Sequence, residues 1–423
     1  MLVVSAIQEN KEKVIEGLKK RNFKQLELVD EVLNTDELRR KTQFELDSVL
    51  AESNKLSKEI GQLFQQGKAD EANQLKEKTA QQKVQVKELQ DLLSEYEESL
   101  KSMLYQIPNI PNEKVVAGVS AEDNEIVFTK GDASPKPDAL PHWELAKKFN
   151  LIDFELGVKI TGAGFPVYLG KGARLQRALI QYFLDKNTEA GYTEVIPPFV
   201  VNEASGFGTG QLPDKEGQMY YVNEDNLYLI PTSEVPVTNI FRDELLDASQ
   251  LPIKLTSYSP CFRREAGSYG KDVRGLNRLH QFEKVEIVRI EKPEDSYEAL
   301  ETMVEHVKGL LEDLELPYRI LRLCGGDTGF ASAMTYDFEV FSAAQEKWLE
   351  VSSVSNFETF QANRLKLRYK ADGKNELCHT LNGSALALPR ILASILENHQ
   401  QADGSIRIPE KLRAYTGFDK IDA

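Results

Sequence analysis

The chain has 423 residues, of which 41% are hydrophobic, so it is long enough to form two or three domains with apolar cores. Its formal net charge of -15 excludes attraction of nucleic acid over the whole surface, because phosphate binding requires lysine and arginine side chains that face the backbone. The three cysteines fit neither a disulfide framework nor a zinc site, and no apolar run approaches a membrane span of about 18 residues, so we expect a cytoplasmic protein without a membrane partner.

Proline marks a boundary in the chain. All 17 prolines follow residue 107, and the first of them, Pro108, lies in the segment Ile-Pro-Asn-Ile-Pro. Because proline interrupts helices, this change in composition predicts an N-terminal helical domain over residues 1–107 and a second domain over residues 108–423.

The N-terminal domain is predicted to hold one short helix and two long ones. Apolar spacing indicates a short amphipathic helix over residues 7–20. Thr35 and Asp36 can cap a long helix that ends before Gly67, and a second long helix follows over residues 69–106. At about 1.5 Å per residue, arms of about 32 residues give rods of roughly 50 Å, and a tight turn between them predicts an antiparallel coiled coil.

The far end of this coiled coil is basic, although the protein as a whole is acidic. Residues 55–87 carry more lysines than carboxylates: Lys55, Lys58, Lys68, Lys76, Lys78, Lys83 and Lys87 against Glu59, Asp70, Glu71 and Glu77. Long polar side chains here could reach phosphate and ribose. A charged helix surface that is merely solvated remains the alternative.

A strand-loop-strand hairpin in the second domain gathers groups suited to a nucleotide. Residues 255–265 and 281–290 are typical of strands joined by a glycine- and charge-rich loop. Period-two alternation places Arg263 and Glu265 on one face, and Phe282, Lys284 and Glu286 on one face of the partner strand. Arginine binds phosphate oxygens and an aromatic ring stacks on a base. An ordinary exposed hairpin with paired charges is the alternative.

This hairpin resembles motif 2 of class II aminoacyl-tRNA synthetases, in the form found in bacterial-type seryl-tRNA synthetases. The motif covers about 255–290, and it includes Phe-Arg-Arg-Glu-Ala-Gly-Ser-Tyr-Gly from Phe262. Residues of about 172–198 resemble motif 1, and those of about 382–398 resemble motif 3. The resemblance covers essentially the whole chain and implies an α+β fold, in which a catalytic antiparallel β-sheet flanked by helices follows a long antiparallel α-helical coiled-coil hairpin.

The resemblance also implies an ATP site with two catalytic arginines. Arg263 resembles the arginine on the α-phosphate, Arg390 the one on the γ-phosphate, and Phe282 the ring that stacks on adenine. Arg278 is a further triphosphate candidate. The implied ATP-binding residues are Arg263, Arg264, Glu265, Arg278, Leu279, Phe282, Glu350, Val351, Ser352, Ser353 and Arg390. The implied Mg²⁺ ligands are Glu350 and Ser353.

A serine pocket is implied in the same way. Its residues are Thr232, Ser233, Glu234, Arg263, Glu286 and Ser384. A site built to bond a hydroxyl group can reject alanine, because the missing hydroxyl would leave buried polar groups unpaired. A plain helix cap is the commoner role of Thr-Ser-Glu and can coexist with binding. Arg264 stands where serine is frequent in the family, so a specific role for it is in doubt.

The activity implied is that of a serine–tRNA ligase. Such an enzyme activates L-serine with ATP and transfers it to tRNA(Ser), and also to tRNA(Sec), and it works as a homodimer with Mg²⁺. Two alternatives remain: a relative that loads an amino acid onto another carrier, and an RNA-binding regulator without catalysis. The first would lack the long hairpin, and the second would show damage at positions such as Arg263 and Arg390.

Overall fold

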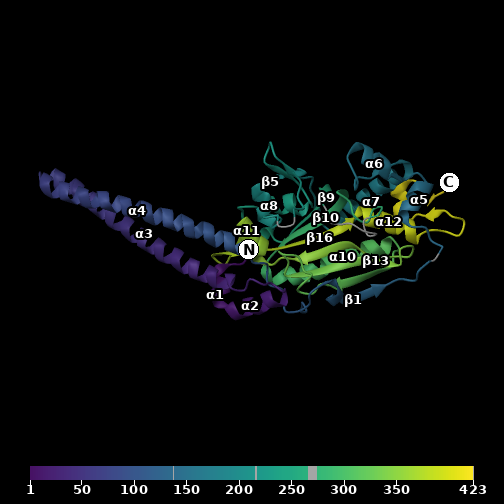
Figure 1. Cartoon of the computed structure of the whole chain (residues 1–423), viewed down its shortest axis with the longest axis horizontal. Helices are drawn as coiled ribbons and strands as arrows, with labels where there is room; N and C mark the ends of the chain where they lie inside the picture. Colours follow the sequence, from purple (N-terminus) through teal and green to yellow (C-terminus); the bar gives the residue numbers. More distant parts are fainter. Residues whose placement is uncertain (137, 215–216, 265–273, 423) are drawn as a thin grey trace. The chain divides into compact units, whose positions relative to one another are not determined.

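A computed structural model describes residues 1–136, 138–214, 217–264 and 274–422. These residues form two compact units (Figure 1), and the short segment Lys20–Asn22 belongs to the second although its neighbours in the chain belong to the first. The first comprises Met1–Lys19 and Phe23–Pro108, and the second comprises Lys20–Asn22 and Asn109–Ala423. In the described part of the chain, no helix combines the length and apolar character that a membrane crossing requires.

The first unit is helical. Its helices are α1 Val4–Glu9, α2 Lys11–Lys20, α3 Leu28–Gln65 and α4 Ala69–Leu104. The long pair α3 and α4 lie side by side (Figure 1), and Gly67 between them has a φ of 76°, which glycine adopts without strain. Leu46 and Leu56 of α3 and Ala72 of α4 are buried, so apolar side chains of both helices lie in the contact between the arms.

Two local helix predictions are wrong. The short helix over residues 7–20 is interrupted at Asn10, where φ is -132°. The long helix α3 begins at Leu28, so Thr35 and Asp36 lie inside it and do not cap it. Asp36 forms ion pairs with Arg39 and Arg40 at 2.8 and 3.0 Å, and this spacing of three and four residues stabilises the helix interior.

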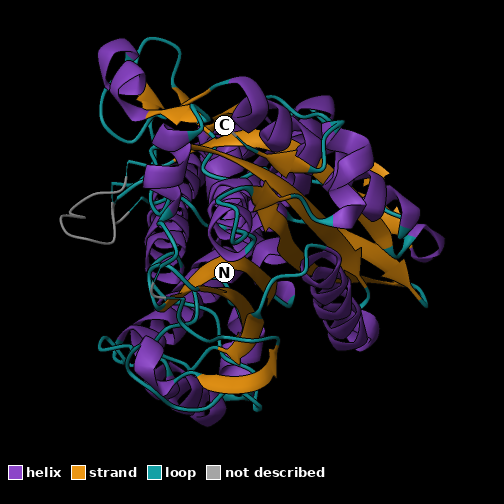
Figure 2. Cartoon of the chain, turned by 90° about the vertical axis from the view of Figure 1, so that its right-hand side faces the viewer, coloured by secondary structure: helices purple, strands orange, loops and turns teal. Residues whose placement is uncertain are grey.

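The second unit is built on an antiparallel sheet (Figure 2). Its strands, in spatial order, are β1 Glu125–Lys130, β11 Tyr318–Arg322, β12 Met334–Ser342, β13 Lys347–Asn356, β16 His379–Ala387, β10 Gln281–Glu291, β9 Ile253–Phe262 and β4 Thr193–Glu194. Neighbouring strands are antiparallel except for β4 and β9, which are parallel. The hairpin predicted from the sequence is therefore formed by β9 and β10, although β9 ends one residue before Arg263.

Helices and small sheets surround the large sheet. The helices are α5 His142–Lys148, α6 Phe154–Ile160, α7 Gly170–Glu189, α8 Glu203–Thr209, α9 Glu234–Asn239, α10 Ser296–Asp313, α11 Thr359–Leu365, α12 Leu388–Asn398 and α13 Arg413–Thr416. The small sheets contain β2 Ile152–Asp153, β3 Val167–Tyr168, β5 Val200–Asn202, β6 Tyr221–Val222, β7 Leu227–Leu229, β8 Leu245–Asp247, β14 Arg368–Ala371, β15 Lys374–Leu377, β17 Ile406–Arg407 and β18 Lys420–Ile421.

The main core lies between one face of the large sheet and helices α7, α10 and α12. Val285 and Ile287 of β10 and Val354 of β13 belong to it, together with the apolar sides of these helices. Successive residues of a strand point to opposite faces, so Lys284 and Glu286 project from the other face of the sheet. That second face carries the candidate site.

Candidate active site

Arg263 and Phe282 lie close together at the loop end of the β9–β10 hairpin. The backbone N–H of Arg263 donates to the carbonyl of His280 at 2.9 Å, which holds the arginine just beyond the last strand pair. Its guanidinium carbon lies 5.2 Å from the centre of the Phe282 ring, and its Nε donates to the carbonyl of Pro231 at 3.3 Å. The guanidinium and the ring thus share one side of the hairpin, as alternation predicts. Glu265 lies outside the described residues.

A row of polar residues crosses the second face of the sheet. Glu286 of β10 pairs with Ser384 of β16, and Ser353 of β13 pairs with Asp337 of β12. Val354 is paired with Gly383, so the antiparallel register sets Ser353 next to Ser384. Four adjacent strands therefore contribute to one continuous row, and the sequence alone could not reveal this because the strands are far apart in the chain.

The pocket beside this row contains a buried lysine. Lys284 Nζ lies 2.5 Å from Glu286 Oε2 and donates to the hydroxyl of Thr232 at 2.8 Å. The Thr232 hydroxyl also accepts the backbone N–H of Glu234 at 3.2 Å, which is a local bond just before α9. The N-cap residue of α9 is Ser233, which is fully buried and makes no side-chain capping bond.

Glu234 is a buried carboxyl group with one strong partner. Gln361 donates to Glu234 Oε1 at 2.6 Å, and the hydroxyl of Thr380 donates to Gln361 Oε1 at 2.7 Å. Burial, together with the negative charge of Glu286, raises the pKa of Glu234 to about 7, although Gln361, Lys284 and Arg263 act in the opposite direction. A carboxyl group poised near neutral pH is a good partner for an ammonium group, whose charge would favour the ionised form.

Glu350 and Ser353 lie on one strand, three residues apart. In a regular strand they would face opposite sides, but the register of β12 and β13 shifts between Phe338 and Glu339, which leaves Val351 as the extra residue of a bulge. The bulge brings both side chains to the polar face. Burial raises the pKa of Asp337 well above its ordinary value, and the charge of Glu350 raises it further, while a hydrogen bond from Ser353 opposes this.

These oxygen groups fit a magnesium ion that is shared with a nucleotide. Mg²⁺ is usually held by one or two carboxylates, several waters and substrate phosphates, and it needs no cage made wholly of protein. Glu350 is exposed, Ser353 is half-buried, and Oδ1 of Asp337 is buried without a hydrogen-bond partner in the described structure. No group of three or more histidine, cysteine, aspartate or glutamate side chains that could hold a metal is found among the described residues.

Arg390 is held at the start of α12. Its Nε donates to the carbonyl of Asn277 at 3.0 Å and its Nη1 donates to the carbonyl of Glu350 at 2.6 Å. The Glu350 carboxylate lies 3.7 Å from the same Nη1. Arg390 thus connects motif 3 with the loop of motif 2 and with the candidate metal ligand.

Other predicted ATP residues occupy different environments. Arg264 is exposed and its guanidinium lies 5.9 Å from the Tyr220 ring, so it points away from Phe282. Arg278 is also exposed. The side chains of Val351 and Leu279 belong to the main core, which leaves only their backbone groups for a ligand. The Ser352 hydroxyl donates to the carbonyl of Ser384 at 2.5 Å.

Two pocket residues were missed at the sequence level. Alternation places Lys284 on the correct face but gives it no role, because its partner Thr232 is 52 positions away in the chain. Gln361 comes from α11, and no local pattern indicates that its amide reaches Glu234.

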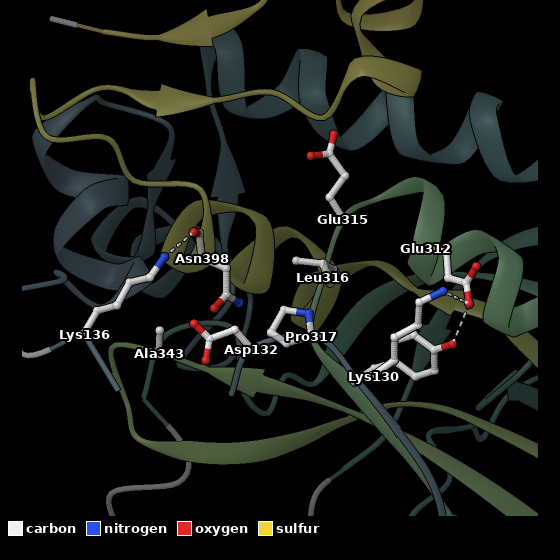
Figure 3. Close-up of a pocket in the computed structure, with 11 residues that line it drawn as sticks. Lys130, Asp132, Lys136, Glu312, Glu315, Leu316, Pro317, Ala343 and Asn398 are labelled. Atoms are coloured by element: carbon white, nitrogen blue, oxygen red, sulfur yellow. Dashed lines mark hydrogen bonds and ion pairs between the residues drawn. The ribbon is translucent and has the colours of Figure 1, made fainter. Parts of the chain in front are cut away.

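A pocket of 540 Å³ elsewhere in the unit contains none of the predicted residues (Figure 3). Lys130 pairs with Glu312 at 2.7 Å, and Lys136 donates to the carbonyl of Asn398 at 3.1 Å. These charges are already matched within the protein, so the candidate chemistry stays with the polar row.

Comparison with known proteins gives matches over both units. The model of the seryl-tRNA synthetase N-terminal domain matches residues 1–111, and that of the tRNA synthetase class II core domain (G, H, P, S and T) matches residues 219–399. The serine–tRNA ligase of Salinibacter ruber is 51% identical over 426 residues, with 100% of both chains covered. The chain belongs to the seryl-tRNA synthetase family. The serine–tRNA ligase of Chlorobium phaeobacteroides is 46% identical, again over 100% of both chains.

Solved seryl-tRNA synthetases share the fold. That of Pyrococcus horikoshii, complexed with ATP, has a TM-score of 0.92 and 35% identity, and covers 100% of this chain and 99% of its own. The Naegleria fowleri enzyme, in complex with AMP, has a TM-score of 0.88 and 29% identity over the same shares. The fold class and family predicted from the motifs are confirmed. Because the matches to seryl-tRNA synthetases include the hairpin domain, the two alternative functions are not favoured.

Proposed function

We propose that this serine–tRNA ligase carries out both steps of its reaction over the polar face of β10, β16, β13 and β12. The observation that carries the proposal is the single row formed by Glu286, Ser384, Ser353 and Asp337, with Arg263 at one end of the face and Arg390 beside Glu350. A serine-sized polar pocket and a triphosphate site then adjoin each other.

L-serine binds in the pocket around Glu234. Its ammonium group pairs with Glu234 and Glu286, which are 6% and 2% exposed and therefore little screened by water. Its hydroxyl group is bonded by the polar side chains of Thr232 and Ser384. Lys284 pairs with Glu286 and balances the charge of that carboxylate. An amino acid without the hydroxyl leaves these buried groups unpaired, which selects for serine.

Activation needs positioning and fixed positive charge more than acid or base catalysis. An oxygen of the serine carboxylate attacks the α-phosphorus of ATP, and the bond from this phosphorus to pyrophosphate breaks. Arg263 neutralises charge on the α-phosphate oxygens, while Phe282 stacks on adenine and Arg390 binds the γ-phosphate. Glu350 and Ser353 would hold Mg²⁺, which supplies charge neutralisation on the phosphate oxygens.

Transfer to tRNA uses the same pocket. A ribose hydroxyl of the terminal adenosine attacks the carbonyl carbon of seryl-adenylate, and the bond to AMP breaks. The N-terminal domain, residues 1–107, binds the tRNA, and residues 108–423 form the catalytic domain. Support comes from the basic end of the hairpin, where Lys55 and Lys83 are exposed. The tRNA substrates in this proposal are tRNA(Ser) and tRNA(Sec), and the enzyme works in the cytoplasm.

The enzyme acts as a homodimer through motif 1. Ile196 in motif 1 is 81% exposed, and Val158 and Ile160 of α6 are 56% and 72% exposed. Large exposed apolar side chains are typical of surfaces that become covered by a partner, and a two-fold axis covers both copies at once.

Serine-dependent exchange of pyrophosphate into ATP tests the activation step. We expect exchange with serine and none with alanine, and loss of at least about a hundredfold in Arg263→Ala, as for removal of a group that stabilises transition-state charge. The matched control is Arg368→Ala, which changes a strand arginine outside the site. Exchange that depended on another amino acid would overturn the specificity, and full exchange in Arg263→Ala would overturn the role of that arginine.

A further inference from the structure

A fully buried histidine connects three segments beneath the triphosphate site. His142, the first residue of α5, lies 2.7 Å through Nδ1 from Oε1 of Glu397, and its backbone N–H donates to the same oxygen at 2.9 Å. The backbone N–H of Leu276 donates to Nε2 of His142 at 2.8 Å. Because Nε2 accepts this hydrogen bond, it carries no proton, and the ring proton on Nδ1 is donated to Glu397.

The segment that His142 holds is the one that bonds Arg390. Asn277 follows Leu276, and its carbonyl accepts the Nε–H of Arg390 at 3.0 Å. Its side chain donates to Gln345 at 3.0 Å, and Gln345 donates to Glu397 Oε1 at 2.8 Å. The hydrogen bonds therefore close a ring through Glu397, His142, the 276–277 backbone and Gln345.

Close packing at Gly275 makes this arrangement specific. Its φ is 69°, and a Cβ atom there would lie 2.1 Å from Nε2 of His142. Only glycine lets the backbone approach the imidazole closely enough for the next N–H to reach Nε2. The loop of motif 2 therefore packs directly against the histidine.

We propose that His142 is a positioning residue for ATP binding, which sets Arg390 through the backbone of residues 276–277. The inference rests on the proposed role of Arg390 at the triphosphate. The orientation of the Arg390 guanidinium is fixed by two backbone acceptors, the carbonyls of Asn277 and Glu350. A shift of the Asn277 carbonyl would rotate the guanidinium away from the γ-phosphate, while the serine pocket around Glu234 has no contact with this ring among the described residues.

Two substitutions at His142 separate its two hydrogen bonds. The amide of asparagine reaches the position of Nδ1, and that of glutamine reaches the position of Nε2. His142→Asn keeps the donor to Glu397 but leaves the buried N–H of Leu276 unpaired, so we expect KM for ATP to rise about tenfold in pyrophosphate exchange. His142→Gln restores an acceptor for Leu276 and should keep KM for ATP within about threefold of the parent. KM for serine should change less than about twofold in both.

The control and the decisive comparison use the same assay. His399→Asn changes another buried histidine, which follows α12, the helix that carries Arg390 and Glu397. Its Nε2 lies 3.0 Å from the carbonyl oxygen of Leu314, and it takes no part in the ring of hydrogen bonds around His142. It should leave the ratio of the two KM values unchanged. If His142 acts through Arg390, His142→Asn has no further effect on KM for ATP in an Arg390→Ala background. Equal factors with and without Arg390, or equal increases in the KM of ATP and of serine, would overturn the inference.

A milder variant protects the test against misfolding. Gln345 is half-buried in a turn, and Gln345→Ala should raise KM for ATP about threefold and lose this effect in the Arg390→Ala background. No change in Gln345→Ala together with no change in His142→Asn would refute the positioning role. Normal KM for ATP in Arg390→Ala alone would instead refute the proposed role of Arg390, so the two failures are distinguishable.

Discussion

Replacing Glu234 by glutamine should stabilise the catalytic unit at high pH while it weakens serine binding. Glu234 is buried beside Glu286, and its carboxyl group titrates near pH 7 in the folded protein. Glutamine has the same shape, can still accept the hydrogen bond from Gln361, and carries no charge. The substitution therefore removes the cost of burying one carboxylate next to another.

The magnitude follows from linkage between protonation and folding. The interval between the ordinary pKa of 4.5 and about 7 corresponds to about 3 kcal/mol of cost for ionised Glu234. In the unfolded chain the proton leaves near the lower value, and in the folded chain near the higher one. Stability is therefore unaffected below the lower value, falls as pH rises between the two, and stays reduced above about 7. Glu234→Gln should gain up to about 3 kcal/mol at pH 8 and under about 1 kcal/mol at pH 5.

Urea denaturation followed by tryptophan fluorescence measures this difference. Both tryptophans, Trp143 and Trp348, lie in the second unit, so the signal reports the unit that contains Glu234. Glu224→Gln, an exposed carboxylate in the turn after β6, is the matched control and should leave the difference between pH 8 and pH 5 as in the parent. Glu234→Gln that is destabilised equally at both pH values would refute the reasoning.

Three further predictions concern serine, tRNA and assembly. KM for serine should fall about tenfold between pH 6 and pH 8. Only ionised Glu234 attracts the ammonium group, and the ionised fraction of Glu234 rises about tenfold over this range. A KM for serine that did not change with pH in the parent protein would contradict this. The double variant Lys55→Glu, Lys83→Glu should lower kcat/KM for tRNA charging about tenfold without changing pyrophosphate exchange. Lys13→Glu, which is also exposed in the first unit, is the control. An equal loss of pyrophosphate exchange in the double variant would argue against a dedicated RNA-binding arm. Ile196→Asp should convert the protein from dimer to monomer in sedimentation velocity, because it places a charge in an apolar interface; an unchanged dimer would place the interface elsewhere.

Sequence patterns predicted the features that depend on neighbours in the chain. The absence of proline predicted the helical N-terminal domain, Gly67 predicted the break between the two long helices, and period-two alternation predicted that Lys284 and Glu286 share a face. The predicted cap at Thr35 and Asp36 failed because α3 begins seven residues earlier, at Leu28, where the first turns are anchored by the buried side chains of Val29 and Val32.

Features that depend on topology could not be predicted from local patterns. The polar row needs the spatial order of β10, β16, β13 and β12, and the shared face of Glu350 and Ser353 needs the bulge at Val351. The contact of Gln361 with Glu234 joins residues 127 positions apart. Family resemblance supplied several of these residues where periodicity could not.

The most direct test of the account is a crystal structure of the protein with a non-hydrolysable analogue of seryl-adenylate. We expect the serine ammonium group between Glu234 and Glu286, the phosphate mimic at Arg263, and adenine against Phe282. An analogue bound away from the β10–β16 face, or with its ammonium group far from both carboxylates, would contradict the proposed site.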